Sequence, residues 1–298
     1  MTTRGEEKLS YFILVLPPLL IYLTVMAFPT IFSVLLSLTN YNGGKVFGNP
    51  NVKFVGFNSY KWMFTEPTGG FWMSLKNNMF IVVMSVFGQI PLGFALAYAL
   101  SRKLIRGTDL FQTMIYLPNV ISPVIIGILF SSFYYSNNSV FMEIVRIFKS
   151  DAVFTIPNQP IIPVLIVMLW MYTGFYMIIF LANIQRIDPQ IIEAARIDGA
   201  SEGQVLSRII LPALSGVIVT CAILAISGSL RSFDLIFVMT QGGPAGMTRV
   251  LSLYMYNSAF RGAVNYPLAN AISTIMVLIS FALIIITRWV ESIFGGKE

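Results

Sequence analysis

Residues 188–212 read DPQIIEAARIDGASEGQVLSRIILP, a polar stretch between two apolar runs that are each long enough to cross a lipid bilayer. Asp188 suits a helix N-cap and Pro189 suits the first helical position, where the N–H that proline lacks would have no partner. Gly199 tolerates the left-handed conformation in which helices often end. Ser201, with a glutamine three positions later, has the spacing of a capping box. The stretch therefore predicts a short helix–turn–helix outside the membrane, and the proline that closes it lets the chain turn into the next span.

The composition is that of a protein embedded in a membrane. Of the 298 residues, 56% are hydrophobic and 11% are charged, whereas a soluble domain carries about a quarter charged residues. The chain has no histidine and one cysteine, which excludes zinc chemistry, a histidine-based triad and a disulfide framework. No catalytic or metal-binding residue is predicted. The net charge of +6 comes from bases at the ends of apolar runs, so we expect contacts with lipid headgroups and not with nucleic acid.

Apolar segments of nearly the roughly 20 residues needed to span a bilayer recur along the chain. We therefore predict an all-α polytopic membrane protein, with residues 1–298 forming a single transmembrane domain and residues 184–212 forming the loop between the fourth and fifth spans. The six predicted spans cover about residues 10–37, 77–100, 111–134, 160–183, 213–233 and 267–290.

The orientation is predicted from lysines and arginines in short loops near the span ends. An even number of spans puts both termini on the same side as the loops at 101–110 and 184–212. Basic residues occur on both sides, but SRKLIR at 101–106 follows the second span directly. We therefore predict that both termini and the 184–212 loop are cytoplasmic. The run at 9–28 is too long for a signal peptide and is interpreted as the first span.

Polar side chains recur at helical spacing inside four of the spans. Two interpretations stay open: they form hydrogen bonds between helices, or they line a path for a polar, uncharged solute, for which hydroxyls, amides and aromatic rings suit a sugar. Arg231 and Asp234, three positions apart, are expected to pair with each other more readily than with a solute. The candidates are Asn78, Ser85 and Gln89 in the second span, Tyr172, Tyr176 and Asn183 in the fourth, Thr220, Ser227, Arg231 and Asp234 in the fifth, and Asn270, Ser273 and Thr274 in the sixth.

The chain has a candidate path but no source of energy of its own. It contains no GxxxxGK[ST] loop to hold a nucleotide, and its spans carry no stripe of unpaired acids for coupling to protons or sodium. Uphill transport would therefore require another subunit. The alternative is a self-contained secondary carrier or channel, and a third possibility is a scaffold protein, which would not need aligned polar faces.

The polar loop also carries a recognisable motif. Glu193-Ala194-Ala195, then Gly199, then Ile209, Leu211 and Pro212 resemble the EAA motif of binding-protein-dependent ABC importer permeases, with the spacing EAA-x3-G-x9-I-x-L-P. The surrounding AARIDGA is similar to the carbohydrate-uptake branch. Three other stretches resemble permeases of this branch, the last of them the maltose- or glycerol-phosphate-type first permease: FVGFNSY at 54–60, residues 75–103, and SFDLIFVMTQGGP at 232–244.

The resemblance implies a type I ABC importer transmembrane fold in a bacterial or archaeal plasma membrane. Residues 189–198 would form a cytoplasmic coupling helix that lies against an ATPase subunit. The implied partners are a second homologous permease in a heterodimer, two cytoplasmic ATPases that bind ATP and magnesium, an extracytoplasmic solute-binding protein and a sugar-class solute; this chain itself would bind no cofactor. The large periplasmic domain of the maltose-type prototype is missing, so no contact made through it is carried over. The residues implied in ATPase coupling are Glu193, Ala194, Ala195, Asp198, Gly199, Ile209, Leu211 and Pro212.

Overall fold

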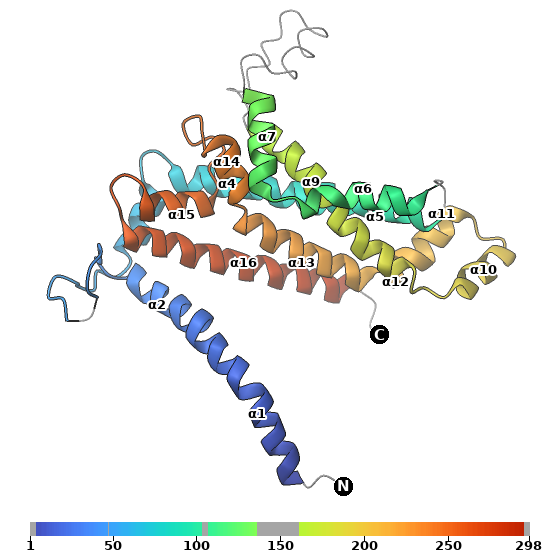
Figure 1. Cartoon of the computed structure of the whole chain (residues 1–298), viewed down its shortest axis with the longest axis horizontal. Coiled ribbons are helices and arrows are strands. Elements are labelled where there is room, and N and C mark those ends of the chain that lie inside the picture. The colour runs from blue at the N-terminus through green and yellow to red at the C-terminus, as the bar shows by residue number, and fades with distance from the viewer. Residues whose placement is uncertain (1–3, 47, 103–106, 136–160, 295–298) are drawn as a thin grey trace, which may run out of the picture. The chain divides into compact units, whose positions relative to one another are not determined.

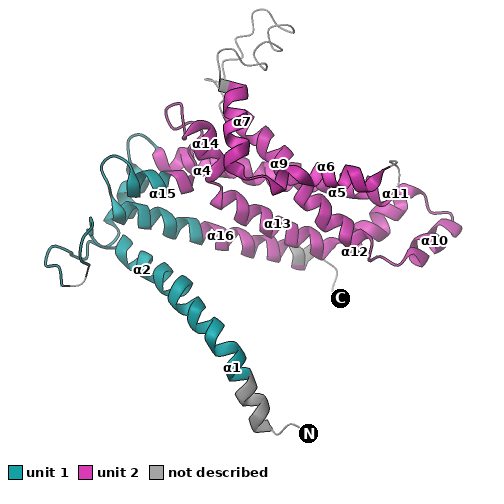
Figure 2. Ribbon diagram, viewed as in Figure 1, with its two compact units in different colours: residues 1–69, 254–277 teal, residues 70–253, 278–298 magenta. Residues whose placement is uncertain are grey.

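Helices make up the regular secondary structure of the chain. The structure is a computed structural model that describes residues 4–46, 48–102, 107–135 and 161–294. Over these residues the β pairing is limited to an isolated bridge between Thr39 and Phe54. The predicted all-α fold is confirmed, and the helices fall into two compact units (Figures 1 and 2). Residues 103–106 of the basic cluster and Pro160 at the start of the predicted fourth span lie outside the described residues.

Four described helical segments are long and apolar enough to cross a bilayer without a break: Tyr11–Ser37, Gly70–Ser101, Ile161–Ile184 and Tyr266–Val290. Two helix pairs meet the same criterion but are bent. The angle is 91° between Thr108–Val120 and Pro123–Tyr134, and 65° between Glu202–Ala213 and Ser215–Arg231. If each bent pair counts as one span, the described chain has the six spans that were predicted.

Two of the predicted spans differ from the helices observed. The third, residues 111–134, is broken between α6 (Thr108–Val120) and α7 (Pro123–Tyr135), because a residue that precedes proline is disfavoured in the helical conformation. The fifth, residues 213–233, ends at Arg231 with α13 (Ser215–Arg231). Asp234 begins a separate helix, α14 (Asp234–Thr240), so the predicted helical face from Thr220 to Asp234 is wrong at its last position.

The first unit contains the residues up to Gly69 together with Tyr254–Val277. Two hydrogen bonds between side chains join its helices: Ser33 Oγ lies 2.6 Å from Asn270 Oδ1, and Ser37 Oγ lies 2.7 Å from Tyr60 Oη. The elements of this unit are α1 (Arg4–Tyr22), the π-helical turn η1 (Leu23–Ala27), α2 (Phe28–Ser37), α3 (Asn58–Thr65), most of α15 (Leu251–Phe260) and the first part of α16 (Tyr266–Phe294).

The second unit contains the remaining helices, and α9 (Ile161–Ile184) is its centre. Both α5 (Ile90–Ser101) and α6 pack against α9, and α7 packs against α14. Two glycines permit the close packing. A Cβ on Gly93 would lie 2.8 Å from Tyr176 Cβ, and a Cβ on Gly174 would lie 2.9 Å from the backbone of Tyr116. Small residues of this kind let membrane helices approach closely.

In the described part of the chain, three π-helical turns interrupt the helices, each of them immediately before an X-Pro pair. They are η1, η2 (Ser85–Gln89) between α4 (Gly70–Met84) and α5, and η4 (Leu206–Ile210), followed by Pro29, Pro91 and Pro212 respectively. Proline lacks an N–H and its ring collides with the carbonyl four residues earlier, which a wider turn relieves. At each site the residue before the proline donates its N–H to the carbonyl five residues back.

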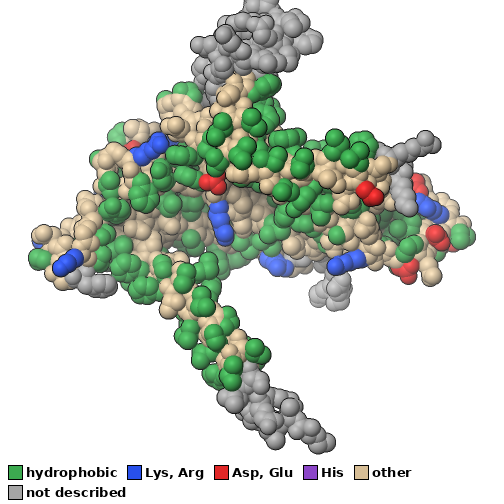
Figure 3. Space-filling view, in the orientation of Figure 1, with side chains coloured by type: hydrophobic (Ala, Val, Ile, Leu, Met, Phe, Trp, Pro, Cys, Tyr) green, Lys and Arg blue, Asp and Glu red, His purple; other side chains and the backbone are tan. Residues whose placement is uncertain are grey.

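Apolar side chains are spread over much of the described surface in Figure 3, as expected for helices in contact with lipid. Exposed large apolar residues occur on each of the membrane-length segments, including Phe87 at 76% and Phe281 at 66% exposure. Acidic and basic side chains gather instead at the end of the second unit that carries α10 (Pro189–Ile197) and α11 (Glu202–Val205). The polar loop 188–212 therefore stands outside the apolar surface of its own unit.

Candidate functional site

The polar loop has the local structure predicted from its sequence. The Asp188 side chain accepts a hydrogen bond of 2.9 Å from the Gln190 N–H and caps α10. Gly199 has φ of +84°, and the two bonds that close the helix end, Gly199 N–H to Arg196 C=O and Ala200 N–H to Ala195 C=O, form a Schellman motif. Ser201 and Gln204 form the predicted capping box at the start of α11.

The two faces of α10 differ in their surroundings. Ile192 and Ala195 pack against the buried cluster formed by residues of α5, α9, α11, η4 and α13, so the last alanine of the EAA triplet faces the protein. Glu193 and Ala194 are exposed, together with Asp198 and Gly199 beyond the helix end. The exposed side also carries large apolar residues, Ile191 at 53% and Ile197 at 86% exposure.

The second half of the motif turns the chain back toward the next span. Ile209 packs against the same buried cluster, Leu211 is half-buried and Pro212 is exposed. The short helix α12 (Leu211–Ala213) follows the wide turn η4, and the axis then bends by 65° into α13. The predicted turn after Pro212 is therefore present, two residues beyond the proline at Leu214.

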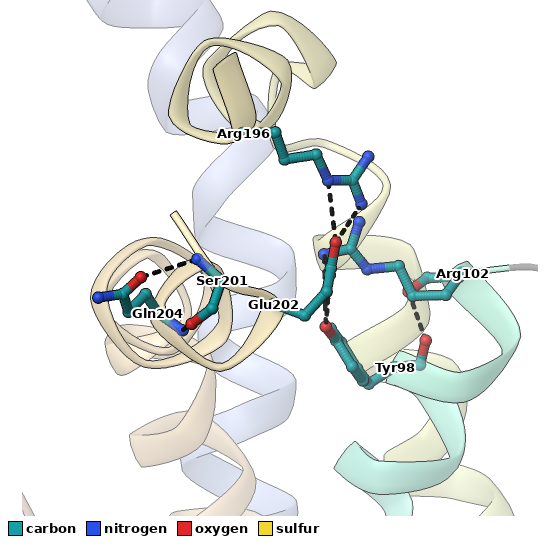
Figure 4. Close-up of polar contacts among 7 residues, drawn as sticks. Tyr98, Arg102, Arg196, Ser201, Glu202 and Gln204 are labelled. Atoms are coloured by element: carbon teal, nitrogen blue, oxygen red, sulfur yellow. Dashed lines mark hydrogen bonds and ion pairs between the residues drawn. The ribbon is translucent and has the colours of Figure 1, made fainter. Parts of the chain in front are cut away.

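Glu202 links the polar loop to the end of the second span. Its Oε1 receives two contacts from Arg196, at 3.0 Å from Nε and 2.8 Å from Nη2, while its Oε2 lies 2.7 Å from Arg102 Nη2 (Figure 4). Arg102 is the C-cap residue of α5, and its guanidinium lies over the Tyr98 ring at 5.2 Å from the centroid. Glu202 was not predicted from the sequence as a functional residue, because its partner Arg102 lies a hundred positions away.

A polar cavity of about 210 Å³ opens where α13 gives way to α14. A single water needs only about 10–15 Å³ of such space, so the cavity is much larger than a packing defect. The lining comes from η2, the start of α7, α9, the end of α13 and the start of α14. Its polar members are Ser85, Gln89, Tyr172, Tyr176, Ser229, Arg231, Ser232 and Asp234.

The predicted path residues thus divide into groups. Ser85, Gln89, Tyr172, Tyr176, Arg231 and Asp234 line this cavity. The predicted ion pair between Arg231 and Asp234 is not formed in the described part of the chain. Ser229 and Ser232, which also line the cavity, were missed; Ser229 is four residues beyond Ala225 on α13, Ser232 is three residues further on, just past the helix end, and this spacing was the available signal.

Other predicted path residues lie away from the cavity lining. Asn78 is fully buried, donates to the Ser229 carbonyl at 2.9 Å and accepts from the Leu251 N–H at 2.8 Å, which corresponds to the interhelical interpretation. Ser227 is half-buried on α13. Asn270, Ser273 and Thr274 belong to the first unit, where Asn270 bonds to Ser33 and the Thr274 hydroxyl bonds to the Asn270 carbonyl.

Comparison with known proteins identifies the family. Residues 89–296 match the family described as the binding-protein-dependent transport system inner membrane component. The chain belongs to this family. As an ABC importer permease subunit it hydrolyses no ATP, because that reaction belongs to separate ATPase subunits, and it works with a solute-binding protein. The alternative of a self-contained carrier or channel is therefore set aside.

Individual permeases similar to this one cover nearly its whole length. A probable ABC transporter permease protein of Pyrococcus horikoshii is 31% identical over 99% of both chains. A lactose transport system permease protein of Rhizobium radiobacter is 32% identical over 93% of each chain, and a multiple sugar-binding transport system permease protein of Streptococcus mutans is 32% identical over 88% of each. A chain of a bacterial ABC transporter involved in the import of the acidic polysaccharide alginate has the same fold, with a TM-score of 0.80 over 97% of both chains at 23% identity.

Proposed function

We propose that this permease subunit carries a sugar or a sugar-like solute through the cavity at the α13–α14 break. The polar lining is the observation that carries the proposal, because most of it is uncharged: the Gln89 amide, the Ser229 hydroxyl, and the phenols of Tyr172 and Tyr176. Amides and hydroxyls exchange hydrogen bonds with sugar hydroxyls, and aromatic rings cover the apolar faces of a sugar ring. The names of the lactose and multiple-sugar relatives support the same class.

An acidic sugar is a second candidate because Arg231 also lines the cavity. A guanidinium is suited to a carboxylate, which it can hold through two parallel hydrogen bonds. Asp234 lies in the same lining and would repel an anion, so the two charges favour a solute that carries polar groups of both kinds.

Residues 188–212 are proposed as the contact with the ATPase subunits. Ala194 on the exposed side of α10 is small and lets a partner approach the helix backbone, and exposed Glu193 is available to a basic group. Ile191 and Ile197 supply apolar area on the same helix. Two ATPases would bind ATP and magnesium, and their closure on ATP would draw the coupling helices together and switch the spans between inward-facing and outward-facing states.

The second half of the pathway is proposed to come from a homologous permease subunit in a heterodimer. Both termini and the 188–212 loop would lie in the cytoplasm of a bacterium or archaeon, because the loop would contact the ATPase subunits on that side of the membrane. The binding protein would deliver solute from the opposite side. Native mass spectrometry of the purified importer is expected to find one copy of this chain, one copy of a second permease and two ATPase subunits; two copies of this chain would contradict the heterodimer.

Uptake by the complete importer in proteoliposomes tests the solute class. We expect import of at least one of lactose, maltose and raffinose, and we expect Tyr172→Phe to raise the KM for that sugar by about two- to tenfold, the effect of one lost hydrogen bond. Tyr116→Phe is the matched control, since Tyr116 lies on α6 away from the cavity lining. Import of none of these sugars would contradict the neutral-sugar proposal.

Uptake of an alginate oligosaccharide tests the second candidate solute, an acidic sugar. If the solute is an acidic sugar, the importer transports this probe and Arg231→Gln reduces its uptake. Equal KM values for the two tyrosine variants, with any sugar that is imported, would show that the cavity is not the solute path.

A further inference from the structure

The backbone connection between the coupling helix α10 and the return helix α11 is weak by itself. It passes through Gly199 in the left-handed region, and a Cβ at this position would meet no atom within 4 Å. Glycine leaves the chain free to rotate at such a point. The side chains of α10 that pack against the buried cluster are Ile192 and Ala195, so few apolar contacts hold the helix in place. The backbone bond from Ala200 N–H to Ala195 C=O spans this turn, and a force on α10 would act on it at Gly199 unless a side-chain contact also spans the turn.

Glu202 spans that turn. It occupies the first turn of α11, where a carboxylate is favoured by the helix dipole, and the capping box of Ser201 and Gln204 fixes the start of the same helix. From this position the two carboxylate oxygens bind different partners. Oε1 accepts from Arg196 in the last turn of α10, and Oε2 accepts from Arg102 (Figure 4). One carboxylate therefore joins three segments of the chain.

Arg102 gives the link a firm attachment to the second span. Its side chain is 16% exposed, compared with 44% for Arg196 and 58% for Glu202. Its Nη2 lies 3.3 Å from Tyr98 Oη, and its guanidinium lies over the Tyr98 ring, which stacks in turn on Phe94 of the same helix. Arg102 is thus oriented by α5 and presents one nitrogen to Glu202.

We propose that Glu202 is a positioning residue for transport: it makes the coupling helix, the return helix and the cytoplasmic end of the second span move together. The inference rests on the proposed contact between residues 188–212 and the ATPases. Without the Glu202 carboxylate, α10 stays folded and docked on its ATPase but turns at Gly199, so that ATP hydrolysis continues while less of the motion reaches the spans.

The contribution of Glu202 to folding is expected to be small, because half-exposed ion pairs add little to stability. Glu202→Gln keeps the size of the side chain and removes its charge, so this variant should insert and assemble with its partners. Gel filtration and thermal unfolding of the purified complex check that it does.

The test measures the ratio of ATP molecules hydrolysed to solute molecules imported, in proteoliposomes that contain the complete importer. The labelled solute is the one that the unaltered importer accepts among lactose, maltose, raffinose and alginate oligosaccharide. Glu202→Gln is expected to raise this ratio at least about fivefold, the lower end of typical coupling between two sites. Arg102→Gln should have a similar effect, and the double variant should be no worse than either single one. Ser207→Ala is the control, because Ser207 is exposed in the same loop and its hydroxyl bonds to the Gly203 carbonyl one helical turn earlier.

The ratio distinguishes the possible outcomes. An unchanged ratio in Glu202→Gln, or additive effects of the two substitutions, overturns the inference. A separate variant, Ala194→Trp, tests the underlying contact by crowding the exposed side of α10 and should release the ATPase subunits during purification. If Ala194→Trp keeps the ATPases and imports normally, the proposed contact fails; if it loses them while Glu202→Gln keeps a normal ratio, the role of Glu202 alone fails.

Discussion

Gly199 offers a perturbation of the coupling loop that acts on backbone conformation alone. Its φ is +84° and a Cβ there would touch nothing within 4 Å, so a side chain would meet no steric obstacle from its neighbours. The left-handed conformation costs an L-residue about 1–2 kcal/mol, and a β-branched residue is among the least suited to it. Gly199→Val should therefore reduce the population of the native turn by about 5- to 30-fold relative to its alternatives.

The loss of this turn would disconnect the end of α10. The bonds from Gly199 N–H to Arg196 C=O, 3.0 Å, and from Ala200 N–H to Ala195 C=O, 2.9 Å, both depend on it. We expect Gly199→Val to lower solute uptake in proteoliposomes at least about fivefold, with reduced co-purification of the ATPase subunits and unchanged membrane insertion. Gly199→Asn, which tolerates the left-handed region, should retain most of the uptake.

Gly203 supplies the matched control. It lies four residues further on, inside α11, where an added Cβ would meet no atom within 4 Å and φ is not positive. Because alanine is a better helix former by about 1 kcal/mol, Gly203→Ala should leave uptake unchanged or slightly improved. Uptake at the unaltered rate in Gly199→Val, or an equal loss in Gly203→Ala, would refute the reasoning.

Two further predictions concern stability of the second unit, measured as thermal unfolding of the purified complex in detergent. Gly174→Ala should destabilise it by about 1–3 kcal/mol, because the added methyl group would overlap the Ile115 carbonyl on α6; Gly216→Ala, with open space around it, should not. Asn78→Leu should cost about 1–3 kcal/mol, because the buried Leu251 N–H loses its acceptor, and the exposed Asn58→Ala should have no such effect. Equal unfolding temperatures within either pair would contradict the packing or the hydrogen bond on which it depends.

The features that could be predicted from the sequence are those that depend on neighbours along the chain. Asp188, Gly199 and the capping box each act within a few residues, and their roles in the polar loop follow from local conformational preferences. Such signals need no knowledge of which helices are neighbours. The π-helical turns were not predicted: each precedes a proline that removes one helical hydrogen bond, but Pro17, Pro18 and Pro118 lie inside α-helices without such a turn.

The features that escaped prediction depend on which helices meet. Asn78 and Gln89 lie at helical spacing in one span, yet Asn78 bonds only to backbone at α13 and α15, whereas Gln89 both bonds to the Met168 carbonyl and lines the cavity. The contact between Glu202 and Arg102 joins residues a hundred positions apart. The break after Arg231 was missed because the two residues at the break are Ser232 and Phe233. Neither is a glycine or a proline, the usual signs of a helix end.

The glycines of the α5–α6–α9 packing also limit how the unit can move. Where a Cβ at Gly93 or Gly174 would collide with a neighbouring backbone, the helices cannot slide past one another without opening the contact, so α5, α6 and α9 resist shear. A switch between inward-facing and outward-facing states must then bend the chain elsewhere. The breaks between α6 and α7 and between α13 and α14 are available for this, and both border the polar cavity, so that bending at either would change the shape of the cavity itself.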